Sequence, residues 1–296
     1  MAKLSSLGVI RAQGDDAAQF LQGQLTQDFA LLDTTHARLA GYCTAKGRLL
    51  ASFIGFKSAP GEILLLCSRD ILATTLKRLS MFVLRAKVKL SDASDEFMLR
   101  GLVGDAASAL IDPALPPWTR IESGAASLVQ LYPALGQVRA LWIAPLGTPE
   151  PVAPELESEL WQWSEVRSGI ATVTLPIVEA FVPQMLNYES VGGVSFKKGC
   201  YPGQEVVARS QFRGTLKRRV YLLHGAAAMT AGQEVFHSSD PDQPCGSVAQ
   251  AARAAEGGFD ALVSMQTSAA DSGALRLASG EALQLLELPY PLLADI

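Results

Sequence analysis

Residues 197–205 read KKGCYPGQE, and this stretch is the most informative part of the sequence because it places one cysteine inside a stiff turn. Glycine tolerates positive φ and the close approach of backbone or ligand, so Gly199 and Gly203 predict a tightly shaped turn. Pro202 fixes its own φ and stiffens that turn. Cationic neighbours favour thiolate over thiol, so the two lysines indicate a reactive Cys200. The alternative is a buried cysteine beside a turn, since free cysteine is among the most buried residue types.

The composition is that of an ordinary globular protein. A length of 296 residues predicts two or three domains, and 49% hydrophobic with 18% charged residues argues against disorder. No apolar run approaches the roughly 20 residues that cross a bilayer, and the first residues lack the apolar segment of a signal peptide. The four cysteines, at positions 43, 67, 200 and 245, form no Cys-x-x-Cys pair. We therefore expect a cytoplasmic protein without a disulfide scaffold, a metal site or a membrane segment.

The charge is distributed unevenly along the chain. The net charge is −4, yet residues 197–219 hold seven basic residues and one acidic residue, so this segment carries +6 and the remainder −10. A local basic segment on an acidic protein indicates an anionic ligand or partner. A solvated strand edge protected by lysine and arginine is the alternative. The basic residues are Lys197, Lys198, Arg209, Arg213, Lys217, Arg218 and Arg219.

The hydrophobic pattern predicts a mixture of strands and helices followed by an all-strand C-terminal part. Helices are predicted from Asp15 or Asp16, with Gly23 inside, and over 69–82, 105–111 and 155–166. Strands are predicted over 8–14, 39–45, 48–56, 62–67, 97–103 and 138–143, with a charged edge strand over 87–90. Three prolines in residues 148–154 predict a linker. From residue 218 onward, six short strands predict a small barrel or sandwich.

Four stretches together resemble a known family. They are KKGCYPGQE with the VVAR that follows it, FLQGQLTQD at 20–28, YCTAKGR at 42–48, and FVPQMLN at 181–187 with GGVSF at 192–196. They are similar to the signature segments of the YgfZ family of folate-binding proteins. That family is related in fold to the T-protein, the aminomethyltransferase of the glycine cleavage system. The likeness spans most of the chain.

The resemblance implies an α+β fold with the three-domain, T-protein-like architecture. In it, a discontinuous central domain and a ferredoxin-like domain would fall in residues 1–150. Residues 151–217 would complete the folate-binding region and carry the cysteine motif, and residues 218–296 would form a C-terminal β-barrel. The domains would enclose a channel for tetrahydrofolate or a one-carbon derivative of it. The implied function is to support the assembly or repair of iron–sulfur proteins and, through them, tRNA modification. The implied partners are folate and iron–sulfur cluster proteins or their assembly factors.

The resemblance also suggests which residues form the site. Cys200, in the motif that carries the resemblance, is the candidate reactive thiol. No histidine lies near it in sequence, which argues against a cysteine hydrolase. Local alternatives stay open. Tyr201 could belong to the core, and Glu205 could order the cysteine turn. The amides of Gln184 and Asn187 could hydrogen-bond the backbone. The candidate folate-binding residues are Lys46, Arg48, Gln184, Asn187, Lys198, Tyr201, Gln204, Glu205, Arg209 and Arg213.

Two departures argue against glycine-cleavage chemistry. Ala51 and Ser52 stand where the aminomethyltransferases carry paired aspartates, and neither residue supplies a charged carboxylate. The pterin-binding glutamate of those enzymes falls near Arg167, and Glu165, two positions away, is expected to point elsewhere. Whether the chain is an enzyme therefore stays open. The alternatives are a folate-dependent one-carbon transferase and a tRNA-binding module, the latter supported only by the basic segment.

Overall fold

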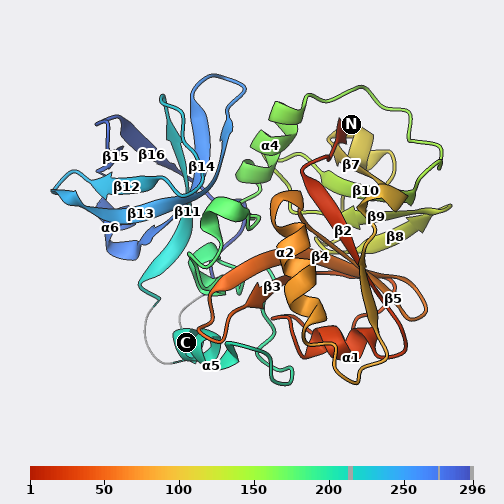
Figure 1. Cartoon of the computed structure of the whole chain (residues 1–296). Helices are drawn as coiled ribbons and strands as arrows, with labels where there is room; N and C mark the ends of the chain where they lie inside the picture. The colour runs from red at the N-terminus through yellow and green to blue at the C-terminus, as the bar shows by residue number, and fades with distance from the viewer. Residues whose placement is uncertain (213–215, 273, 294–296) are drawn as a thin grey trace.

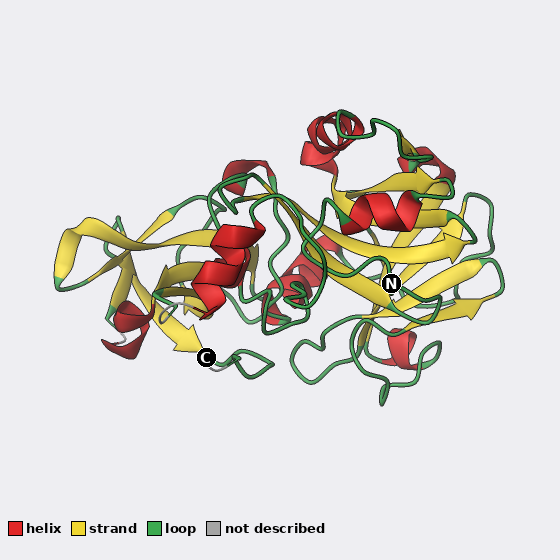
Figure 2. Ribbon diagram, turned by 90° about the horizontal axis from the view of Figure 1, so that it is seen from below, coloured by secondary structure: helices red, strands yellow, loops and turns green. Residues whose placement is uncertain are grey.

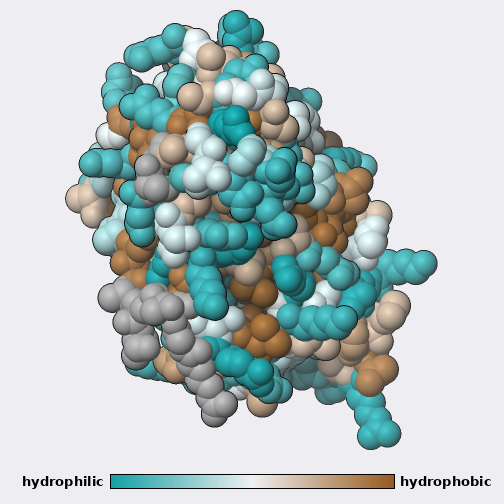
Figure 3. All heavy atoms as spheres, turned by 90° about the vertical axis from the view of Figure 1, so that its left-hand side faces the viewer, coloured by the Kyte–Doolittle hydropathy of each residue, from teal (hydrophilic) through white to brown (hydrophobic). Residues whose placement is uncertain are grey.

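The computed structural model describes residues 1–212, 216–272 and 274–293. Two five-stranded antiparallel sheets lie on one side and a closed β-barrel on the other, with one helix, α4 (Ser158–Arg167), between them (Figure 1). Figure 2 shows the barrel at one end and the sheets at the other. Seen from the barrel side, hydrophilic side chains predominate and hydrophobic ones gather in several separate patches (Figure 3).

The N-terminal sheet has the strand order β3-β4-β5-β2-β6. The charged strand β6 lies at its edge, as the sequence predicts. Alternation along the strands gives the sheet two buried faces, and α2 packs on one of them through Ile71, Leu72 and Leu79. The elements are β2 (Leu7–Gln13), α1 (Ala17–Gln22), β3 (Ala37–Cys43), β4 (Leu49–Ala59), β5 (Glu62–Ser68), α2 (Arg69–Ser80) and β6 (Lys89–Asp92).

The second sheet has the order β1-β7-β10-β9-β8 and packs on the other face of the N-terminal sheet. Val9, Leu64 and Leu66 of the N-terminal sheet share one hydrophobic core with Leu141 and Ile143 of the second. The elements are β1 (Ala2–Lys3), η1 (Ser94–Glu96), β7 (Phe97–Val103), α3 (Asp105–Ser108), β8 (Arg120–Ser123), β9 (Ala126–Gln130) and β10 (Arg139–Pro145).

The C-terminal strands close into a barrel of order β11-β14-β13-β12-β15-β16, so the predicted β-barrel is confirmed. Closure leaves no free sheet edge. The barrel has its own hydrophobic core. Its elements are β11 (Arg218–Gly225), β12 (Glu234–His237), β13 (Asp240–Arg253), β14 (Phe259–Gln266), α6 (Thr267–Ser272), β15 (Leu275–Leu277) and β16 (Ala282–Leu286). The ferredoxin-like domain and the domain bounds at residues 150 and 217 stay predictions.

Several local predictions differ from the structure. Gly23 lies outside α1, because the helix ends at Gln22 and Gly23 is its C-terminal cap. Strands β8 and β9 were not predicted, and α6 interrupts the C-terminal part that was predicted as strands and turns alone. A strand edge was one reading of the basic segment, but residues 204–212 of that segment form a helix, α5 (Gln204–Phe212).

Candidate functional site

The cysteine motif forms a turn that packs on the β3–β4 turn and then enters α5. Gly203 has φ +81°, and a Cβ placed on it would lie 2.7 Å from the Cα of Gly47 and closer still to the carbonyl oxygen of Thr44. Only glycine fits such a position without displacing backbone. Gly199 meets no atom within 4 Å of an added Cβ. The tight turn predicted for both glycines is therefore required only at Gly203.

Lys198 fastens the motif to the end of α1. Its side chain is buried, and its Nζ donates hydrogen bonds to the carbonyl oxygens of Gln22 and Leu25, the latter at 2.6 Å. The same ammonium lies 4.6 Å from the ring centroid of Tyr201, within cation–π range. Burial lowers the pKa of Lys198 to about 8, against the opposing charges of Asp28 and Cys200. Lys198 and Tyr201 thus form part of the packed base of the cysteine turn.

The segment after α1 is joined to the segment before the motif. Thr26 Oγ1 donates to the carbonyl oxygen of Gly193 at 2.6 Å and accepts from the backbone N–H of Gly41 at 2.7 Å. The N–H of Ser195 donates to the carbonyl oxygen of Thr26 at 2.9 Å. Together with the contacts of Lys198 and Gly203, these bonds bring all four stretches that carry the family resemblance into one cluster.

Cys200 is exposed at this cluster, whereas the other three cysteines are buried; all four lie in the described part of the chain. Burial raises the pKa of Cys43 and of Cys67 to about 12. A reagent or partner in solution therefore reaches Cys200 and not the buried thiols. The alternative of a buried cysteine beside a turn is wrong for Cys200.

The charged candidates around Cys200 lie mostly at the surface. Arg209 forms an ion pair with Glu205 one helical turn away on α5, with an N–O distance of 2.6 Å. Arg48 donates to the carbonyl oxygen of Ala180, and Lys46 is exposed in the β3–β4 turn. Gln204 is half-buried at the start of α5. The remaining candidate, Arg213, lies outside the described residues.

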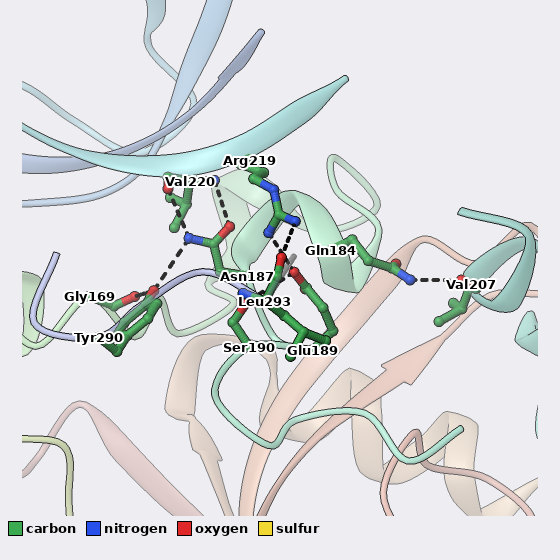
Figure 4. Close-up of polar contacts among 10 residues, drawn as sticks. All are labelled: Gly169, Gln184, Asn187, Glu189, Ser190, Val207, Arg219, Val220, Tyr290 and Leu293. Carbon is green, nitrogen blue, oxygen red and sulfur yellow. Dashed lines mark hydrogen bonds and ion pairs between the residues drawn. The ribbon is translucent and has the colours of Figure 1, made fainter. Parts of the chain in front are cut away.

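Gln184 and Asn187 are fully buried and bind backbone (Figure 4). Gln184 Nε2 donates to the carbonyl oxygen of Val207 in α5 at 2.7 Å. Asn187 Nδ2 donates to the carbonyl oxygen of Val220 at 2.9 Å, and its Oδ1 accepts from the N–H of the same residue at 3.2 Å. These bonds join the segment around η3 (Pro183–Leu186) to α5 and to the barrel.

A cavity lies between the two sheets, beside the end of α4. Its walls include Leu7 and Ile54 of the N-terminal sheet, Leu141 of the second sheet, and the aromatic rings of Trp118 and Tyr132. The free volume is about 50 Å³, which is room for a few water molecules. A ligand with a ring system needs these side chains to shift, because typical ligand pockets hold roughly 300–1,000 Å³. None of the nine described folate candidates lines this cavity.

Arg139 and Glu165 both line the cavity. Arg139, on β10, is buried, donates from Nε to Ser164 Oγ at 3.0 Å and lies 4.5 Å from the ring centroid of Trp161. Burial lowers its pKa to about 10. Glu165, on α4, also faces the cavity, and burial raises the pKa of its carboxyl while the nearby charge of Arg139 opposes the shift. Glu165 therefore faces this cavity, and its orientation relative to a pterin stays a prediction.

Ser52 lines the same cavity. Its Oγ accepts a hydrogen bond from the N–H of Val173 at 2.9 Å, and the side chain is 4% exposed. Ala51 is fully buried and pairs with Tyr42 in the sheet. One of the two positions compared above with the aspartates of aminomethyltransferases thus faces the cavity and carries a hydroxyl.

The sequence prediction missed the cavity residues Trp118, Tyr132 and Arg139. Trp118 precedes β8 and Tyr132 follows β9. Because neither strand was predicted, the sequence did not show where these two residues lie in the fold. A signal did exist for Arg139, because a charged residue begins the otherwise apolar strand β10. Buried charge without a neighbouring opposite charge in sequence is costly and points to a site or a network.

Two classes of feature are not found among the described residues. No three histidine, cysteine, aspartate or glutamate side chains in residues 1–212, 216–272 and 274–293 come together so that they could hold a metal ion. Across those same ranges, no helix has the length and apolar character needed to cross a bilayer.

Known proteins resemble this chain in sequence and in fold. A curated protein of Edwardsiella ictaluri, "tRNA-modifying protein YgfZ", is 32% identical over 97% of this chain and 90% of its own length. Proteins of the same name from Klebsiella pneumoniae and Aliivibrio fischeri are 30% and 29% identical, over 94% and 99% of this chain and 89% and 92% of theirs. No protein-family model matches.

Among solved structures, the glycine cleavage system aminomethyltransferase T of Bartonella henselae superposes with a TM-score of 0.73. The match covers 97% of this chain and 85% of that one at 17% sequence identity. At this level of identity the likeness concerns the fold alone, so the predicted T-protein-like architecture is confirmed and the chemistry is not.

Proposed function

The chain belongs to the family of tRNA-modifying proteins named YgfZ, and we propose that it binds tetrahydrofolate and supports the assembly or repair of iron–sulfur proteins. Through those proteins it would support tRNA modification. The observation that carries the folate part is the buried Glu165–Arg139 cavity between the sheets of a T-protein-like fold.

The cavity supplies the groups that a pterin requires. A pterin ring presents N–H donors along one edge, and the carboxylate of Glu165 is an acceptor for such donors. Arg139 supplies N–H donors for the ring's carbonyl oxygen and nitrogen acceptors. Trp118 and Tyr132 offer aromatic faces against which a flat ring packs. Tetrahydrofolate is a carrier of one-carbon groups. The residues that line this cavity would bind and orient it.

Turnover of an aminomethyl group is disfavoured at this cavity. Ser52 offers a hydroxyl, which stays protonated near neutral pH and so cannot provide the negative charge of a carboxylate. Glu165 is the one acidic side chain among the described residues that line the cavity, and we assign it to pterin binding. We therefore favour an accessory protein over a one-carbon transferase.

Cys200 is the group that we assign to the iron–sulfur partner. A thiolate is a soft ligand suited to iron in clusters. One cysteine cannot hold a four-iron cluster alone, so the thiol would act on a cluster or a cysteine presented by a partner protein. Its exposure at the surface, away from the cavity, supports such an encounter.

Calorimetric titration of the purified protein with tetrahydrofolate tests the folate part. We expect micromolar binding that Glu165→Gln weakens at least tenfold, because the amide replaces one acceptor oxygen by a donor. Glu159→Gln is the matched control, since Glu159 is exposed on the same helix as Glu165 and lines no part of the cavity. Absence of binding by the wild-type protein at high micromolar ligand would remove the folate proposal.

Complementation in cells tests the thiol. Cys200→Ala should leave folding and tetrahydrofolate affinity nearly unchanged and abolish support of iron–sulfur enzymes that modify tRNA. Cys245→Ala, at a buried barrel position, is the control for loss of a thiol as such. Full complementation by Cys200→Ala would show that the thiol is dispensable.

A further inference from the structure

A second hollow lies where α5, the segment around η3, strand β11 and α6 meet. Its free volume is about 700 Å³, within the range of roughly 300–1,000 Å³ that small-molecule sites occupy. It shares no lining residue with the cavity between the sheets. The apolar side chains of Val182, Met185 and Leu216 form part of its wall.

The charged groups of this hollow are cationic. Lys217 and Arg218 line it, and none of its described lining residues is acidic. Arg218 uses one N–H for the carbonyl oxygen of Cys245, at 3.2 Å, which holds the guanidinium in place. An arginine has five N–H donors, so others remain for a ligand. The hollow therefore favours an anion although the protein as a whole is acidic.

Three residues with hydroxyl groups line the same hollow as the two cations. Ser210 comes from α5, and Thr267 and Ser268 come from the start of α6. Arginine and lysine together with serine and threonine hydroxyls are the side chains that bind the phosphate and sugar of nucleotides. The combination matches a phosphate ester of a sugar better than it matches a bare carboxylate, which cations alone can bind.

Gln184 forms part of the same wall and carries an unused acceptor. Its side chain is fully buried, and while Nε2 donates to Val207, Oε1 has no hydrogen-bond partner (Figure 4). A buried acceptor without a partner is unfavourable unless a bound molecule donates to it. A ligand for this hollow is thus expected to bring an N–H or O–H donor as well as an anion.

We propose that this hollow binds a nucleotide, either free or as an unpaired nucleotide of an RNA strand. The phosphate would lie against Lys217 and Arg218, and the hydroxyls would bind phosphate and ribose oxygens. A base or ribose donor would reach Gln184, and the flat base would pack on Val182 and Met185. The site is independent of the folate cavity, so either proposal can fail without the other.

Binding is measured by fluorescence anisotropy with a short, labelled, single-stranded RNA, and by calorimetry with adenosine and cytidine monophosphates. Lys217→Ala should weaken binding at least fivefold and reduce the slope of log K against log salt by about 0.7, the value of one phosphate contact with a single strand. Lys77→Ala is the matched control, because Lys77 is exposed on α2 and does not line the hollow.

The RNA and monophosphate measurements together show whether the ligand is a free nucleotide or part of an RNA strand. Monophosphate binding that depends on Lys217 assigns the site to free nucleotides, and binding of RNA without monophosphates assigns it to an RNA strand. Equal losses in Lys217→Ala and Lys77→Ala would overturn the proposal, since they would indicate general electrostatic attraction. Displacement of the RNA by an oligo-γ-glutamate peptide at equal concentration would also overturn it and assign the hollow to a carboxylate chain. So would failure of both probes to bind the wild-type protein.

Discussion

Asn187 is one of the residues that join the segment before the cysteine motif to the barrel. It has φ +57°, a left-handed conformation that asparagine tolerates better than most residues. Its carboxamide binds both the N–H and the C=O of Val220. The sequence left open whether this amide contacts a pterin or the backbone, and in the structure it contacts backbone.

Asn187→Ala should lower the free energy of unfolding by about 2–4 kcal/mol. The change leaves two buried backbone groups of Val220 without partners, and alanine lacks the polar side chain that helps asparagine adopt the left-handed conformation. Asn187→Gly loses the same bonds but tolerates the conformation, so it should be about 1 kcal/mol less destabilising. Urea unfolding of both variants measures the difference, and equal stabilities of the two would contradict the role of backbone conformation.

Lys198 makes stability depend on pH in the alkaline range. Its pKa is lowered to about 8 in the folded protein, chiefly by burial, whereas an unfolded lysine titrates near 10.4. Between these values the unfolded chain holds more protons, so the free energy of unfolding rises with pH. This gain in the free energy of unfolding is complete above about pH 10.4 and is lost as the pH falls to 8. Because the ammonium keeps some solvent contact, we expect about 1–2 kcal/mol.

The comparison of wild type with Lys198→Met isolates this effect. The stability of wild type relative to the variant should increase between pH 7 and pH 10, measured by urea unfolding at both values. Lys197→Met is the control, because Lys197 is exposed in the same segment. A constant difference between wild type and Lys198→Met across this range would show that Lys198 titrates normally.

At the scale of the element, the cysteine turn depends on one of its two glycines. Gly203→Ala forces a Cβ against Thr44 and Gly47 at φ +81°, and we expect a loss of at least about 2 kcal/mol. Gly199→Ala meets open space and should change stability by less than about 0.5 kcal/mol. Thermal unfolding ranks the two, and comparable losses in both would contradict the packing described for Gly203.

Helix α5 shows where local sequence stops being informative. It follows a proline and a glycine, buries only Val207 and Gln211, and carries Glu205 and Arg209 one turn apart on its exposed side. A strongly amphipathic stripe is the signal that predicts a helix, and a short helix with only two buried residues lacks it. The long, periodic α2 and the edge strand β6 were predictable because their patterns are local.

At the scale of the whole molecule, the cavity could not be predicted because its walls come from both sheets and from α4. Glu165 was expected to point away by counting positions on a helix, yet the direction of a helical side chain depends on how the helix packs. The packing of α4 is set by distant residues: an added Cβ at Gly101 of β7 would collide with the ring of Trp161, so the glycine admits that ring. The family resemblance supplied the fold, while the contents of the cavity required the structure.

The chain also returns from the barrel to the cavity after β16. The ring of Tyr290 packs edge-on against Tyr132, with centroids 5.6 Å apart, and Tyr132 packs against Trp118 at 5.8 Å. Tyr132 and Trp118 both line the cavity. The hydroxyl of Tyr290 donates to the carbonyl oxygen of Gly169 at 2.7 Å (Figure 4). The C-terminal segment thus holds one wall of the cavity in place from outside.

We therefore predict that Tyr290 affects both stability and ligand affinity. Tyr290→Ala should lower the free energy of unfolding by about 3–5 kcal/mol through the lost ring and weaken tetrahydrofolate binding about tenfold, because Tyr132 loses its support. Tyr290→Phe keeps the ring and should lose about 1 kcal/mol with its hydrogen bond while binding within threefold of wild type. Urea unfolding and calorimetric titration at a temperature where both variants stay folded measure the two effects. If folded Tyr290→Ala binds as tightly as wild type, the C-terminal segment stabilises the fold without positioning the cavity wall.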